Sequence, residues 1–95
     1  MKATLIYRFE QDYDDGAMLR MVIWKVSEPV PPATHLFKYR LVYLEHGKRI
    51  LGFDNERGKG DHRHAGKREM PYDFVDVEAL VNDFVTAVKD RRNTR

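Results

Sequence analysis

The apolar residues of this chain change their spacing once, at Val75, and this change decides the fold class. Before it, four segments are predicted to be strands: 2–9, 36–45 and 48–55 alternate apolar and polar residues with a period of two, and 17–26 is apolar on both faces in its middle. After it, apolar residues fall on one stripe of an amphipathic helix: Val77, Leu80, Val81, Phe84 and Val88. The pattern predicts an α+β fold, an antiparallel β-meander of four or more strands with a C-terminal α-helix packed on one face.

Turn chemistry separates the predicted strands. The segment 11–16 ends in Asp15-Gly16, and His46-Gly47 forms a second tight turn. Residues 27–35 contain three of the four prolines and predict a stiff connector, because proline does not run through a helix or a central strand. Asp76 is the predicted N-cap of the helix.

The predicted sheet has one apolar face and one more polar face. The first strand alternates so that Leu5 and Tyr7 are expected on the same side, and Trp24 is expected in the core. The helix stripe can pack on an apolar face made by Tyr39, Leu41, Tyr43, Leu51 and Phe53. The other face carries Arg8, Arg20, Lys38 and Arg40. Its simplest interpretation is a solvated face, and a track for phosphates is the sharper alternative.

Length and composition narrow the class of protein. Ninety-five residues suit a single domain, 1–95, and the chain has no cysteine, which excludes disulfides, cysteine nucleophiles and cysteine-rich zinc sites. No apolar run reaches the roughly 20 residues of a membrane span or resembles a signal peptide. We therefore expect a soluble, cytoplasmic protein with no membrane partner. A domain this small buries only about two-thirds of its unfolded surface, which leaves room for a homodimer.

Positive charge gathers in one segment. The chain has a net charge of +2, whereas residues 57–68 hold five Lys/Arg and one Asp, so the other residues sum to −2. Such a segment predicts a polyanionic partner, although a solvated loop would look the same. The residues expected to contact nucleic acid are Arg57, Lys59, Arg63, Lys67, Arg68 and the nearby Asn55.

His62 and His64 are two residues apart, so in an extended chain both rings point to one side and Arg63 points to the other. Two imidazoles in one site can supply a general base and a general acid near neutral pH. Asp54 or Asp61 could orient a ring. This set predicts metal-independent RNA cleavage without a cofactor, with Arg57 and Lys59 holding phosphate.

Three alternatives use the same residues. A His-x-His pair with Asp54, Asp61 or His35 could bind a metal ion and serve a metal-dependent nuclease. The basic segment could grip nucleic acid without catalysis, and the sheet could receive a protein segment by strand addition. Outside the metal hypothesis, His35 and His46 are expected to be surface histidines.

Three stretches resemble one family across nearly the whole chain: "MVIWKVSEPVPPATHLFKYRL", "GFDNERGKGDHRH" and "PYDF" ahead of the helix. They are similar to the TumE-type toxins of prokaryotic toxin–antitoxin systems. The resemblance implies a small cytoplasmic toxin encoded beside a DNA-binding antitoxin that neutralises it. It also marks four motif positions as functional: Asp54, Asn55, His62 and His64.

Overall fold

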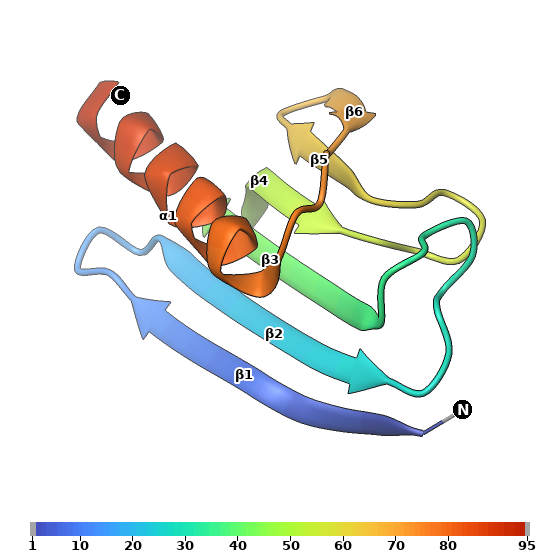
Figure 1. Cartoon of the computed structure of the whole chain (residues 1–95). Coiled ribbons are helices and arrows are strands. Elements are labelled where there is room, and N and C mark those ends of the chain that lie inside the picture. The colour runs from blue at the N-terminus through green and yellow to red at the C-terminus, as the bar shows by residue number, and fades with distance from the viewer. Residues whose placement is uncertain (1, 95) are drawn as a thin grey trace.

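Six strands follow one another across a single antiparallel sheet, with one helix lying over one of its faces (Figure 1). The computed structural model describes residues 2–94. The strands are β1 (Ala3–Asp12), β2 (Met18–Val26), β3 (Phe37–Glu45), β4 (Lys48–Asp54), β5 (His62–Ala65) and β6 (Arg68–Pro71), and each pairs with the next. The helix is α1 (Val77–Thr94). The predicted α+β meander is confirmed.

The basic segment contributes two strands that its sequence pattern does not reveal. β5 and β6 are four residues each and form a short hairpin that extends the sheet beyond β4. Their side chains are mainly charged or histidine, so no alternation of apolar residues indicates a strand here. Their pairing places the two histidines in a sheet, where the period of two holds strictly.

A β-bulge in β1 corrects one predicted face. Leu5 pairs with Trp24, and the next paired residue is Tyr7, opposite Ile23, so Ile6 is an extra residue in β1. A bulge reverses the alternation that follows it. The expectation that Leu5 and Tyr7 share a face is therefore wrong: Tyr7 packs toward the helix, while Leu5 and Trp24 lie on the opposite side. Trp24 is half-buried there and is not part of the core.

The core lies between the sheet and α1. Tyr39, Leu41 and Tyr43 of β3 are almost fully buried on the helix side, as the alternation predicts. From the helix, Leu80 and Phe84 are completely buried, and Phe84 meets Phe53 of β4 edge-on at 5.2 Å between ring centroids. Packing on this single face leaves the outer face of the sheet without a helix from residues 2–94.

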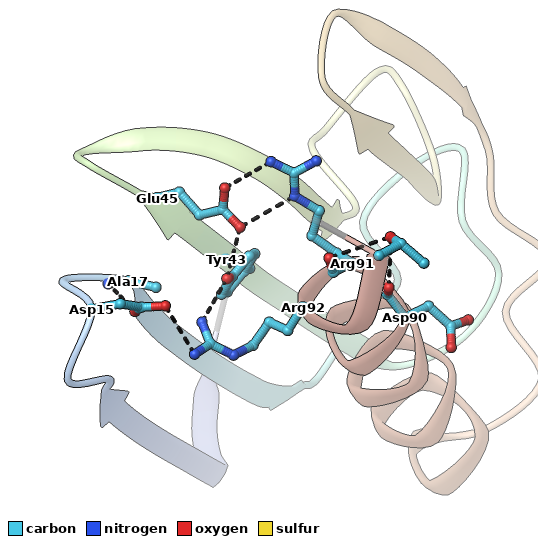
Figure 2. Close-up of polar contacts among 8 residues, drawn as sticks. Asp15, Ala17, Tyr43, Glu45, Asp90, Arg91 and Arg92 are labelled. Carbon is cyan, nitrogen blue, oxygen red and sulfur yellow. Dashed lines mark hydrogen bonds and ion pairs between the residues drawn. The ribbon is translucent and has the colours of Figure 1, made fainter.

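Both ends of α1 are fixed by side chains. Asp76 accepts a hydrogen bond from the amide of Ala79 at 2.7 Å, which confirms the predicted N-cap. Near the C-terminus, Arg91 donates to Glu45 at 2.7 and 3.2 Å, and Arg92 donates to the hydroxyl of Tyr43 at 2.9 Å (Figure 2). These contacts hold the helix against the end of β3. α1 is the one helix of residues 2–94, and it lacks the apolar length needed to span a membrane.

The proline-rich connector lies beside the loop between β4 and β5 (Figure 1). The amide of Gly58 donates to the carbonyl of Pro31 at 2.7 Å. Gly60 has a φ of +76°, and a Cβ on it would come within 3.2 Å of Pro32. Gly60 is therefore required both by its backbone conformation and by the close approach of the connector. The two segments together cover the end of the sheet where β5 begins.

Candidate functional site

Asp54, His62 and His64 lie together on the outer face of the sheet. In the β4–β5 register, Asp54 pairs with His62 and Gly52 pairs with His64, so the three side chains point to the side away from α1. Arg63 pairs with Phe53 and points toward the helix side, as the spacing of the two histidines predicts. Opposite His64, a Cβ on Gly52 would lie 3.7 Å from that ring and 3.2 Å from Arg49, so Gly52 leaves space for both side chains.

The two imidazoles converge on one carboxylate oxygen. Oδ1 of Asp54 lies 2.5 Å from Nε2 of His62 and 3.9 Å from Nε2 of His64. The three side chains are only 5 to 12% exposed. Within residues 2–94 the buried Oδ1 has no aligned hydrogen bond, and its short contact with His62 is an ion pair only when that ring is protonated. A carboxylate oxygen in this position needs a proton or a cation to offset its lost hydration.

Each imidazole turns its other nitrogen toward an oxygen atom. Nδ1 of His62 donates to the carbonyl of Gly60 at 2.9 Å. Nδ1 of His64 lies 3.5 Å from Oε2 of Glu69 on β6. These outer contacts orient both rings so that the Nε2 atoms face Asp54. A carbonyl or carboxylate behind the ring is also what orients histidine ligands in metal sites.

Burial lowers the pKa of His64, and the nearby charge of Arg49 lowers it further. The carboxylates of Asp54 and Glu69 act in the opposite direction but do not cancel these effects. His64 is therefore neutral near pH 7, with an unprotonated nitrogen that can bind a metal ion or accept a proton.

These atoms fit a divalent cation. Donor atoms from Asp54, His62 and His64 all lie within 4.8 Å of one another. A zinc ion bound at about 2.0 to 2.2 Å by each donor requires donor separations of about 3 to 3.6 Å, which small side-chain rotations would reach. By contrast, an acid and a base that act on RNA should face two sides of a phosphate. Here both Nε2 atoms face the same oxygen.

Asp61 does not join this cluster. Its carboxylate accepts hydrogen bonds from His35 at 2.8 and 3.0 Å and from the hydroxyl of Tyr39 at 2.6 Å. The amide of Phe37 donates to Nδ1 of His35, so the proton of the neutral ring lies on Nε2, toward Asp61. Burial and the charge of Asp61 raise the pKa of Tyr39. This second cluster joins the connector, β3 and the loop before β5.

The expectation that His35 is a surface histidine is wrong, whereas His46 is exposed in its turn as expected. The side chain of His35 is 16% exposed, and its ring stacks on Phe74 with 3.8 Å between centroids. Asp61 lies 26 residues away in the sequence, so no local pattern could have revealed this pair. The aromatic surroundings arise only when the connector folds back over β3.

Asn55 extends the pairing of β4 with β3 through its side chain. The residue is 2% exposed. Its side-chain oxygen accepts from the amide of Tyr39 at 3.0 Å, and its side-chain nitrogen donates to the carbonyl of Phe37 at 2.7 Å. Both ends of the amide are thus used by the β3 backbone. This engagement gives Asn55 a structural function next to the site.

The five basic residues of the segment do not form one patch. Arg57 and Lys59 are exposed in the β4–β5 loop, and Lys67 and Arg68 are exposed at the β5–β6 turn. Arg63 lies on the helix side. Lys59 lines a small cavity of about 170 Å³ together with Asp61, His62, Glu69, Met70 and Pro71.

Replacing Asn55 by alanine should destabilise the fold by about 2 to 4 kcal/mol, because it leaves the buried amide of Tyr39 and carbonyl of Phe37 without partners. Urea unfolding followed by circular dichroism measures this loss. Asn82→Ala, at an exposed position of α1, is the matched control and should change stability by less than about 0.5 kcal/mol. Equal effects of the two variants would contradict the structural function of Asn55.

One comparison with known proteins identifies a family for this chain. A family model described as Toxin TumE matches residues 2–92, from β1 through most of α1. Among curated proteins and solved structures, no significant match was found. The match includes Asp54, Asn55, His62 and His64 and covers nearly all of the described residues. The chain therefore belongs to the TumE toxin family.

Proposed function

We propose that this toxin is a ribonuclease whose centre is a divalent cation bound by Asp54, His62 and His64. Membership of a toxin family implies an antitoxin partner. The basic segment that carries both histidines supports a polyanionic target, and RNA offers both phosphates and a 2′-hydroxyl. Cleavage of RNA is thus the reaction that best combines the charge of the segment with the chemistry of the three buried groups.

One observation supports a bound cation in this proposal. The buried Oδ1 of Asp54 is approached by two Nε2 atoms and forms no aligned hydrogen bond with any group of residues 2–94. A cation would satisfy the carboxylate and accept the lone pairs of both rings at once. Two nitrogen ligands and one oxygen suit zinc, manganese or iron. When bound, such an ion polarises a phosphoryl oxygen and lowers the pKa of a bound water molecule.

The residues around this centre have separate tasks. The carbonyl of Gly60 and the carboxylate of Glu69 hold the two rings in place, and a phosphate would approach the cluster from the outer face. Positive charge for that phosphate comes from nearby side chains: Arg40 pairs directly with Asp54 in the β3–β4 register. Arg49 lies beside His64 and acts on its charge.

Metal-free acid–base catalysis is the second candidate, and the neutral state of His64 favours it. In that reaction His64 would accept the 2′-hydroxyl proton, and a protonated His62 would donate to the leaving oxygen. Both candidates require the two histidines, so alanine variants do not distinguish them. Whether cleavage depends on a metal ion does distinguish them.

Tag-free protein should bind about one equivalent of zinc or manganese per chain, measured by calorimetry on metal-stripped protein. Asp54→Asn should abolish this binding, because an amide oxygen carries no charge to offset that of the ion. Asp61→Asn is the matched control, since its carboxylate is bound to His35 and Tyr39, and it should retain the affinity. Equal loss in both variants, or no binding by the wild type, would contradict the metal site.

RNA incubated with the purified toxin should be fragmented, and a chelator should stop the reaction until excess metal is restored. His64→Ala should reduce the rate by at least about 100-fold, because it removes a ligand of the centre. Gel electrophoresis of total RNA measures this directly. Fragmentation that persists in chelator would favour the acid–base mechanism, and intact RNA from cells killed by the toxin would refute the ribonuclease.

A further inference from the structure

The outer face of the sheet carries an apolar surface that no element of residues 2–94 covers. Over β1 to β3 this face is hollowed by a pocket of about 340 Å³, whose lining includes Leu5, Val22, Trp24 and Val42. Leu5 is 49% exposed, and Trp24 is half-buried. A half-buried tryptophan that lines a shallow apolar hollow offers a surface on which a flat ring can stack.

Cations surround this hollow unequally. Arg8 pairs with Glu10 at 2.7 Å, and Arg20 pairs with Asp12 at 2.8 Å, so both are partly neutralised. Lys38 and Arg40 of β3 are exposed and form no ion pair with any described residue. Their charges are therefore available to an anion that lies on this face.

Strand register connects the hollow to the Asp54–His62–His64 cluster. Lys38 pairs with Trp24 on one side, and Arg40 pairs with Val22 on one side and with Asp54 on the other. Cross-strand partners point to the same face, and neighbouring strands are about 4.8 Å apart. Trp24 and Asp54 are thus on the order of 10 Å apart on one face, with Lys38 and Arg40 between them.

We propose that this face binds single-stranded RNA, with one base stacked on Trp24 and the backbone phosphates on Lys38 and Arg40. Stacking on an aromatic ring beside a cationic track is how proteins bind single strands with little sequence preference. A double helix would not fit, because its bases are already stacked on one another and cannot reach a single ring. The inference rests on the proposed function only in its final step, the delivery of a phosphate to Asp54.

Binding can be measured with non-cleaving Asp54→Asn protein and a short single-stranded RNA oligonucleotide. Trp24 is the only tryptophan of the chain, so its fluorescence reports stacking directly and should be quenched on binding. Trp24→Ala should weaken binding by about fivefold or more, whereas Trp24→Phe should retain most of the affinity. The same oligonucleotide in a duplex should bind more weakly.

Charge variants provide a test that does not depend on the tryptophan. Lys38→Gln and Arg40→Gln should each weaken binding and reduce the slope of log K against log salt by about 0.7. Lys25→Gln is the matched control: Lys25 is exposed on β2, two residues from Ile23, and so lies on the helix side of the sheet. It should leave both the affinity and the slope unchanged.

Several outcomes would overturn the inference. These are equal effects of Lys25→Gln and Lys38→Gln, equal binding of duplex and single strand, or unquenched fluorescence at saturation. Loss of antitoxin binding rather than RNA binding in the Trp24 and Lys38 variants would assign the face to the antitoxin instead. If wild-type protein binds RNA on this face but does not cut it, the inference stands and the proposed ribonuclease fails. If the face variants leave RNA cleavage unchanged, the proposed ribonuclease stands and the inference about this face fails.

Discussion

The pairing of β4 with β5 determines where the three side chains of the candidate site lie. It sets Asp54 opposite His62 and places His64 on the same face two residues on. A slip of one residue in this short ladder would turn both rings to the helix side and leave Asp54 alone. Asn55, immediately after β4, binds the β3 backbone with both ends of its side chain and so holds the end of β4 in place. Because β5 contributes few apolar contacts of its own, its register depends on its pairing with β4 and β6 and on polar contacts such as that of His62 with the carbonyl of Gly60.

The two faces of the sheet differ: one holds the core, and the other carries the candidate site. The helix side contains the core, closed by α1 and held at its end by the contacts of Arg91 and Arg92 with β3 (Figure 2). In the part of the chain that the structure describes, no helix covers the outer side, and along it lie an apolar hollow, cations without ion pairs and the Asp54–His62–His64 cluster. Because the core of this small domain forms on one face of the sheet, the opposite face can remain open for a partner.

Much of the fold could be predicted from sequence because its signals are local. Alternation identified β1 to β4, the change of period identified α1, and the two-residue spacing of His62 and His64 predicted that they share a face. The features that were missed are not local. The bulge at Ile6 depends on pairing with β2, and the contact of His35 with Asp61 joins residues that are 26 apart in the chain. The same holds for the convergence of both rings on one oxygen of Asp54, which required the structure.

Nitrogen-15 NMR of the imidazole side chains during a zinc titration tests the central claim most directly. Zinc is diamagnetic, and the chain has four histidines, two of which lie outside the cluster and act as internal controls. We predict that the Nε2 resonances of His62 and His64 shift in proportion to zinc up to one equivalent, while those of His35 and His46 do not. Unchanged His62 and His64 resonances, or shifts confined to the other two rings, would contradict a metal centre on this face of the sheet.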